Sequence, residues 1–144
     1  AVRVRNPNSI RPWQHVLEPL AGYIELAEML YNQGVYWAEP WNFGPREEDA
    51  KPVGWIVKEM KELWGENASW NVDKGEHPHE ANYLKLDCSK AHNRLHWQPK
   101  WDLPTALKKI VEWHKVYAGR YNMRQICIAQ ITEYQTAGEI SCKQ

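Results

Sequence analysis

The sequence contains no glycine-rich loop. Its eight glycines are never closer than ten residues apart, so neither a GxGxxG turn nor a phosphate-binding P-loop can be present. A Tyr-x-x-x-Lys pair, in which the lysine lowers the pKa of the tyrosine for proton transfer, is also missing, because none of the seven tyrosines has a lysine four residues later. The sequence therefore lacks the motifs that bind a dinucleotide and transfer protons in redox enzymes.

Charge and cysteine content exclude further classes of protein. The formal net charge is +0 at pH 7, which argues against a general affinity for nucleic acid, since that affinity rests on clustered Lys and Arg. No apolar run approaches the roughly 20 residues needed to span a membrane. Cys88, Cys127 and Cys142 form no CxxC pair, so neither a disulfide framework nor a zinc ribbon is expected. Reduced thiols are then the default, and we predict a cytoplasmic protein.

Aromatic residues are abundant and unevenly chosen, with nine Trp and seven Tyr but one Phe. Amphipathic rings suit sites that are half apolar and half wet, although most of the nine Trp are expected in the core.

The 144 residues fit one domain, and we predict an α/β fold that is mainly helical with a few short strands. The periodicities predict helices at 18–33, 52–64, 89–95, 103–117 and 122–135, and strands at 2–5, 41–43, 69–72 and 83–86.

Local signals define the ends of these helices. Pro19 suits the first position of the first helix, and Gly34 ends it. Asp102 is the expected N-cap of the helix at 103–117. We expect a domain of residues 1–135 followed by a polar, disordered tail at 136–144. In the first helix the apolar residues share one face: Leu20, Tyr23, Ile24, Ala27, Leu30 and Tyr31.

Three short segments carry polar residues that are able to bind a ligand. Arg11 and His15 flank Trp13 before the first helix, and an arginine holds a diphosphate as a planar fork. Taken alone, these residues favour a surface arginine beside a core tryptophan. Residues 76–80 contain alternate histidines and a glutamate, but no distant ligand pair is visible, so a solvated loop is favoured over a metal site. Asn42 ends a predicted strand, where it contacts a ligand or, as we favour by default, caps a turn.

Together these segments closely resemble the CDP-glucose 4,6-dehydratase family. The resemblance runs in order over about residues 2–135 and is more specific than any single motif. It is carried by RNPNSIRPWQHVLEPL at 5–20, WNFGP at 41–45, DAKPV at 49–53, HEANYLKLD at 79–87 and the stretch from WQP to VEW at 97–113.

The resemblance implies a fold and an activity. The family belongs to the extended short-chain dehydrogenases, whose members bind NAD in an amino-terminal Rossmann domain and a nucleotide sugar in a smaller carboxyl-terminal lobe. In a complete member NAD oxidises C4 of glucose, water leaves across C5 and C6, and the hydride returns to C6. The product, CDP-4-keto-6-deoxyglucose, is a precursor of dideoxy sugars in bacterial surface polysaccharide. This chain corresponds to the lobe without the Rossmann domain.

The catalytic machinery of the family lies upstream of this chain. The cofactor loop, the catalytic Tyr and Lys, and the acid pair that drives water loss have no counterpart here. We therefore expect no bound cofactor and no metal, and we assign no catalytic residue. On this interpretation the chain binds a CDP-sugar weakly and is not catalytically competent alone.

The resemblance also implies which residues contact the substrate. Arg11 lies in the segment that supplies an arginine to the diphosphate in related enzymes, and Asn42 lies at the strand end that lines their nucleotide pocket. Many relatives have a second arginine in the stretch that contains His79 and Tyr83. We expect these two residues to replace it around the cytidine or the phosphates. With His15, they complete the predicted CDP-sugar site.

In the family, the helix at 18–33 and the strand at 41–43 pack against the Rossmann domain. An unpaired strand edge and an open apolar patch of roughly a few hundred Å² favour association, so we expect a homo-oligomer. The alternative is a truncated or captured gene fragment that serves as a structural or protein-interaction module and no longer binds a nucleotide sugar. A piece of a full enzyme, or a partner of a separate Rossmann chain, also fits the sequence.

Overall fold

A computed structural model describes residues 1–65, 68–77 and 81–137 of the chain. The mixed, mainly helical fold is confirmed. Of the predicted tail, only Thr136, which ends the last helix, and Ala137 are among the described residues. The elements, in chain order, are β1 (Val2–Val4), β2 (Ile10–Pro12), α1 (Leu17–Gln33), η1 (Gly34–Trp37), η2 (Glu47–Asp49), β3 (Ala50–Pro52), α2 (Val53–Trp64), β4 (Trp70–Val72), η3 (Ala91–Leu95), α3 (Leu103–Ala118) and α4 (Met123–Thr136).

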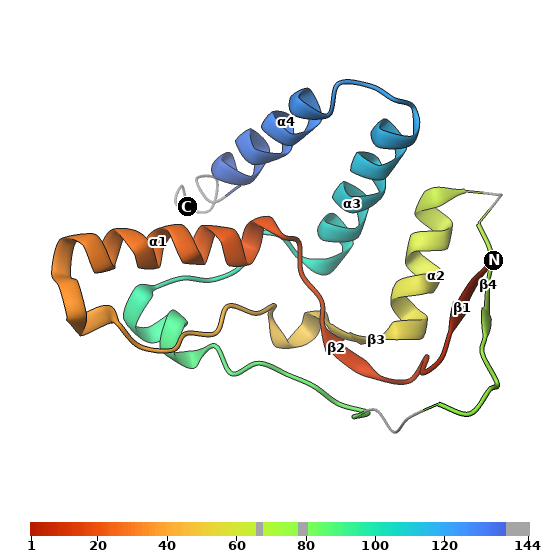
Figure 1. The fold of residues 1–144 in the computed structure, drawn as a ribbon, viewed down its shortest axis with the longest axis horizontal. Helices are drawn as coiled ribbons and strands as arrows, with labels where there is room; N and C mark the ends of the chain where they lie inside the picture. Colours follow the sequence, from red (N-terminus) through yellow and green to blue (C-terminus); the bar gives the residue numbers. More distant parts are fainter. Residues whose placement is uncertain (66–67, 78–80, 138–144) are drawn as a thin grey trace, which may run out of the picture.

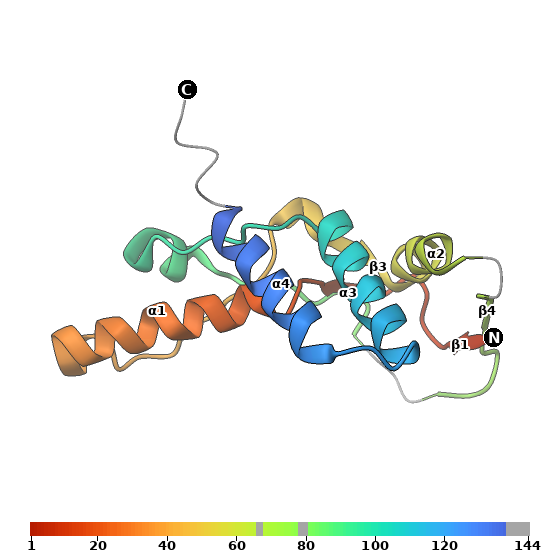
Figure 2. The ribbon, with the colours of Figure 1, turned by 90° about the horizontal axis from the view of Figure 1, so that it is seen from above.

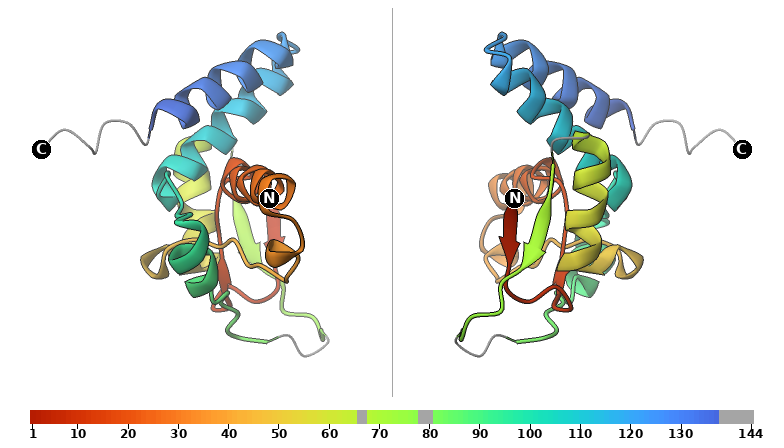
Figure 3. Two further views of the ribbon diagram at one scale, coloured as in Figure 1. Left: turned by 90° about the vertical axis from the view of Figure 1, so that its left-hand side faces the viewer. Right: turned by 90° about the vertical axis from the view of Figure 1, so that its right-hand side faces the viewer.

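The molecule is elongated, with α1 at one end and the β1–β4 pair at the other (Figure 1). The α3–α4 hairpin rises above the start of α1, and the end views of Figure 3 show it on one side of the molecule with the short strands below it. Within the described ranges, no helix combines the length and the apolar content that crossing a bilayer requires.

The four longer helices lie where the periodicity predicts them. α2, α3 and α4 begin and end within one residue of the expected positions. The Asp102 carboxylate accepts a hydrogen bond from the Thr105 amide at 2.9 Å, which confirms the predicted N-cap. α1 instead begins at Leu17, so Pro19 lies within its first turn and not at its first position as predicted. A core cluster of Ile56, Leu103 and Leu107 joins α2 to α3.

The strand prediction was partly wrong. β1 and β4 pair in parallel, as expected for strands at 2–5 and 69–72. Residues 41–43 are not a strand: Phe43 packs its ring edge-on against Trp97, with the ring centroids 5.0 Å apart, and Pro40 and Pro45 flank the segment without amide hydrogens. At 83–86 only a bridge between Ile10 and Tyr83 forms. The unpaired strand edge expected at 41–43 is therefore not present in this form.

A second small sheet was not anticipated. β2 and β3 pair antiparallel, with Arg11 opposite Lys51. Each strand has three residues, and each contains or adjoins a proline, so neither shows the alternation that marks a strand in a sequence. The pair brings segments about 40 residues apart into one surface in the middle of the molecule (Figure 1).

The inner face of α1 packs closely against Phe43. A Cβ atom at Gly22 would lie 2.3 Å from Cδ1 of Phe43, so this position accommodates only glycine while Phe43 keeps its place. One turn earlier, Glu18 is fully buried. The inner side of α1 thus carries a glycine and a carboxylate, and the apolar face predicted from the sequence points away from the core.

The buried Glu18 carboxylate holds three parts of the chain together. It accepts hydrogen bonds from the amides of Lys100 at 3.0 Å and Trp101 at 2.8 Å, and from the Tyr134 hydroxyl at 2.7 Å. Burial and the adjacent Glu18 carboxylate raise the pKa of Tyr134, so its hydroxyl keeps its proton and remains a donor. These bonds attach α1 to the 100–101 turn and to α4.

Replacing Tyr134 with phenylalanine should destabilise the fold, because one donor to a buried carboxylate is lost. A hydrogen bond to a charged group contributes about 1.5–3 kcal/mol, so we expect the free energy of unfolding to fall by about 2 kcal/mol in urea denaturation. Tyr121→Phe, which changes an exposed ring, is the matched control and should leave the midpoint unchanged. Equal unfolding curves for the two variants would contradict the role of Glu18.

Candidate functional site

Arg11 is the central residue of β2, which has hydrogen-bonded neighbours on both sides. β2 pairs with β3 on one side, and on the other the Ile10 amide donates to Asn82 O at 2.9 Å while the Leu84 amide donates to Ile10 O at 3.2 Å. We call β2, β3 and residues 82–84 the Arg11 platform. It gives the most prominent residue of the predicted site a fixed backbone.

The platform sets Lys51 beside Arg11. Residues directly opposite in an antiparallel pair project to the same face, with their Cβ atoms about 4.5–5.5 Å apart. The register thus places two cationic residues on one face of the platform. In the described part of the chain Lys51 has no carboxylate within ion-pair distance, and its ammonium lies 5.9 Å from the centroid of the Trp55 ring. Lys51 was not among the residues predicted from the sequence.

Tyr83 belongs to the opposite face of the platform. It pairs with Ile10, and because side chains alternate along a strand, residues level with Ile10 point away from the face of Arg11. Its exposed ring lies 5.3 Å from the Lys85 ammonium. The structure therefore brings Tyr83 close to Arg11 in the backbone, but places the two side chains on different sides.

Asn42 lies away from the platform. Its side-chain amide donates to Asp87 O at 3.1 Å and so fastens the 41–45 segment to the 85–89 segment. This bond occupies one of its two N–H groups, which leaves the other N–H and the oxygen for a ligand.

His15 is an interior residue. Its Nδ1 accepts a hydrogen bond from the Leu17 amide at 3.3 Å, and its ring packs edge-on against Trp101 with the centroids 5.0 Å apart. Burial, with a smaller contribution from Lys109, lowers its pKa below the ordinary value of 6.5. The neutral imidazole thus satisfies an amide at the start of α1, a role that needs no ligand.

The fifth predicted residue, His79, lies outside the described residues. Its neighbour His77 is described, with Nε2 located 3.5 Å from the Asp73 carboxylate. No group of three or more potential metal ligands occurs among the residues that the structure describes.

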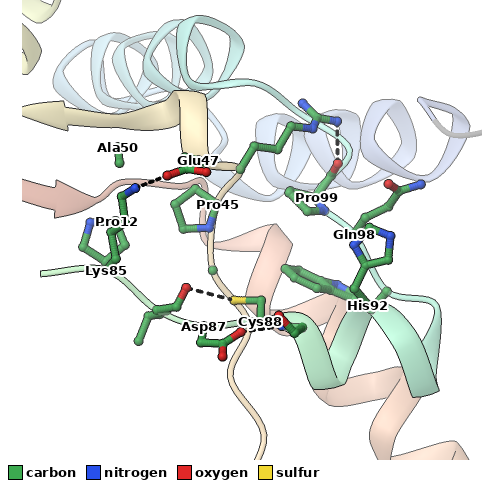
Figure 4. Close-up of a pocket in the computed structure, with 15 residues that line it drawn as sticks. Pro12, Pro45, Glu47, Ala50, Lys85, Asp87, Cys88, His92, Gln98 and Pro99 are labelled. Carbon is green, nitrogen blue, oxygen red and sulfur yellow. Dashed lines mark hydrogen bonds and ion pairs between the residues drawn. The ribbon is translucent and has the colours of Figure 1, made fainter.

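A polar cavity of about 460 Å³ lies on the Tyr83 side of the platform. It is bounded by the 44–47 loop, by β3, and by residues 85–89 and 92–99, and Figure 4 shows the side chains around it. The segments are brought together by tertiary packing alone, and no motif spacing in the sequence indicates the cavity. Its polar lining consists of Arg46, Glu47, Lys85, Asp87, Cys88, Ser89, His92 and Gln98.

Comparison with known proteins identifies what this chain is similar to. It is 54% identical over 136 residues to a CDP-glucose 4,6-dehydratase of Salmonella typhimurium strain LT2, and the match covers 94% of the chain. The resemblance to the CDP-glucose 4,6-dehydratase family is confirmed. The chain spans 38% of the length of this curated relative, at its carboxyl-terminal end. No family model matches the chain.

The described residues do not fit the NAD that this family uses. Dinucleotide sites are built where a strand of a parallel sheet turns through closely spaced glycines into a helix. β1 belongs to a parallel pair, but it continues into Arg5-Asn6-Pro7-Asn8, which contains no glycine. We therefore assign none of the described residues to NAD.

The lowered pKa of His15 predicts a pH-dependent loss of stability. The unfolded chain takes up the proton near pH 6.5 and the folded chain only at lower pH, so the stabilisation by neutral His15 is present above about pH 6.5 and is lost as the pH falls through the folded pKa. His15→Asn keeps an acceptor for the Leu17 amide but does not titrate. Between about pH 7.5 and about pH 5, urea denaturation should show the wild type losing stability relative to this variant.

Asn32→Ala, at an exposed position without a titratable group, provides the control for this measurement. The difference in stability between wild type and Asn32→Ala should not change with pH. If the His15→Asn difference is equally flat, the imidazole is not held neutral by its surroundings.

Proposed function

We propose that this chain is the nucleotide-sugar-binding portion of a CDP-glucose 4,6-dehydratase, and that it does not catalyse the reaction alone. The observation that carries the proposal is the pairing of Arg11 and Lys51 on one face of the platform, in a chain that is 54% identical to a protein with that activity. The diphosphate of a CDP-sugar is an anion that an arginine and a lysine on one face can bind together.

The two cations have different parts in this proposal. Arg11 offers a planar fork of donors that matches a phosphate bidentately, whereas Lys51 acts as a point charge. One guanidinium N–H of Arg11 already donates to Ile10 O at 2.8 Å, which orients the group along the strand. Because both residues are on paired strands, their separation is fixed before the ligand arrives, and this lowers the entropic cost of binding.

The proposal restricts the chain to binding and orientation. Hydride exchange with NAD and loss of water take place, in a complete member, on residues upstream of this chain. Supporting this division, no tyrosine of the sequence is followed four residues later by a lysine. We also propose that the chain acts in the cytoplasm, where its described cysteines, Cys88 and Cys127, remain free thiols.

Titration calorimetry with CDP tests the proposed site. Arg11→Ala and Lys51→Ala should each weaken CDP binding by about 10-fold or more, because each removes a charge-assisted contact of about 1.5 kcal/mol or more. Neither should alter the binding of cytidine, which has no phosphate. Lys58→Ala, an exposed lysine on the adjacent α2, is the matched control and should bind CDP like the wild type.

Two results would contradict the proposal. One is the absence of CDP binding to the wild-type chain at millimolar concentration. The other is an equal loss for CDP and cytidine in Lys51→Ala, which would show that Lys51 acts through folding and not through the phosphates.

A second function, protein association, is favoured by the outward face of α1. Tyr23 and Tyr31 are 56% and 91% exposed, and with about 150–250 Å² per aromatic side chain these two rings alone present about 300 Å². Leu20, Ile24 and Val35 are also exposed and extend the patch. Figure 2 shows α1 at the margin of the molecule.

We propose that a second copy of the chain covers this surface in an isologous dimer. A stable interface takes about 800 Å² from each partner, and the exposed apolar residues of the α1 patch supply an apolar centre for such an interface. A self-complementary contact is satisfied when two α1 helices pack face to face. In a complete relative, further polypeptide competes for the same surface.

Light scattering after size exclusion measures this association directly. The wild type should be a dimer at high concentration, and the double variant Ile24→Lys, Tyr31→Lys should be a monomer with unchanged helicity. Glu62→Lys places the same charge on an exposed position of α2, outside this face, and should leave the dimer intact. A monomeric wild type, or dissociation by Glu62→Lys, would overturn the assignment of this face.

A further inference from the structure

Trp13 contacts both residues of the cation pair. Its backbone amide donates to Arg11 O at 3.1 Å, and its indole Nε1–H donates to Lys51 O at 2.9 Å. Arg11 and Lys51 are opposite each other in the β2–β3 register, and Trp13 follows directly after the end of β2. A single residue is therefore bonded to the backbone of each cation-bearing position.

The ladder that joins β2 to β3 is short. Each strand has three residues and ends in a proline, which has no amide hydrogen. The Ile10 amide donates to Asn82 O at 2.9 Å, on the opposite side of β2. Of the β2 residues, Arg11 is therefore left to supply an amide to β3. With so short a ladder, an additional bond between the two segments has a large effect on their register.

The Trp13 ring is held by the helical core. It packs against the cluster of Ile56, Leu103 and Leu107, which joins α2 to α3. Side chains in a close-packed cluster keep one rotamer, so the indole N–H has a fixed direction. The bond therefore fixes Lys51 relative to the core as well as to β2.

A second tryptophan restrains the other end of Lys51. The Lys51 ammonium lies 5.9 Å from the centroid of the Trp55 ring, and Trp55 packs against the same core cluster. The carbonyl and the ammonium of Lys51 are thus each in contact with a ring that the core holds. A shift of the β3 backbone would therefore change the place of the ammonium.

We propose that Trp13 is a positioning residue of the CDP site: its indole N–H, bonded to Lys51 O, holds Lys51 level with Arg11 so that both cations meet one diphosphate. The inference rests on the function proposed for the cation pair and adds a residue that acts through Lys51. Loss of the indole N–H leaves both charges in the chain and changes only where one of them is held.

Trp13→Phe removes the indole N–H and keeps an aromatic ring in the core. Titration calorimetry should show CDP binding weakened by about 3-fold to 10-fold, the range expected for loss of one neutral hydrogen bond. In the Lys51→Ala background the same substitution should weaken CDP binding by less than about 2-fold, because no ammonium is left to displace. Binding of cytidine, which has no phosphate, should be unchanged by Trp13→Phe.

Trp37→Phe is the matched control. Trp37 is buried, and its Nε1–H donates to Gln33 Oε1 at 2.8 Å. It belongs to η1, which follows α1 and lies away from β2 and β3 (Figure 1). This variant should lower the melting temperature, as Trp13→Phe does, but bind CDP like the wild type.

A second measurement needs no ligand. The Trp55 ring shifts the nuclear magnetic resonance signals of the Lys51 side chain, so in Trp13→Phe these signals should move toward their values in an unfolded chain. Unchanged Lys51 signals would overturn the inference, and so would an equal loss of CDP binding by Trp13→Phe in the wild-type and Lys51→Ala backgrounds. CDP binding that depends on Lys51 but not on Trp13 would overturn this inference alone. A wild type that binds no CDP would overturn the proposed function together with it.

Discussion

The architecture depends on one buried carboxylate. Glu18 is fully buried and accepts three hydrogen bonds, two from the backbone amides of Lys100 and Trp101 and one from the Tyr134 hydroxyl. A buried charge is tolerated only when its lone pairs are satisfied, so these three segments cannot separate without exposing or orphaning it. The carboxylate thus determines where α1 meets the carboxyl-terminal helices. Since β2 leads directly into α1, it also fixes the end of the Arg11 platform.

This arrangement explains why α1 exposes its apolar face. A helix has one side toward the core, and here that side is taken by Glu18 and by Gly22, which admits the Phe43 ring. On the opposite side Ile24 and Tyr31 are largely exposed, and Tyr23 is half exposed with its ring edge-on to Phe43. The same contact orients Phe43 toward Trp97, and so shapes one wall of the polar cavity. The exposed apolar face of α1 and this wall of the cavity are therefore consequences of the same packing at the start of α1.

Helices were predictable from the sequence because their signals are local. The periodicity of α2, α3 and α4 and the Asp102 cap depend on residues within one or two turns, and these elements lie where expected. The strands depend on partners far along the chain. WNFGP at 41–45 has the composition of a strand, yet it packs through Phe43 and the Trp41 ring, which stacks on Trp37, and not through a ladder. β2 and β3 are too short and too rich in proline to show an alternating pattern.

The candidate site shows the same division between local and distant information. Arg11 was identified through the family resemblance, but Lys51 becomes relevant only through the β2–β3 register, which joins residues about 40 positions apart. His15 was selected because it belongs to the same polar segment as Arg11, whereas in the structure its Nδ1 accepts a hydrogen bond from the Leu17 amide. Adjacent residues of a strand project to opposite faces. The residues directly before and after Arg11 therefore do not share its face. In a sheet of three-residue strands, the residues that share a face are the cross-strand neighbours. For Arg11 that neighbour is Lys51.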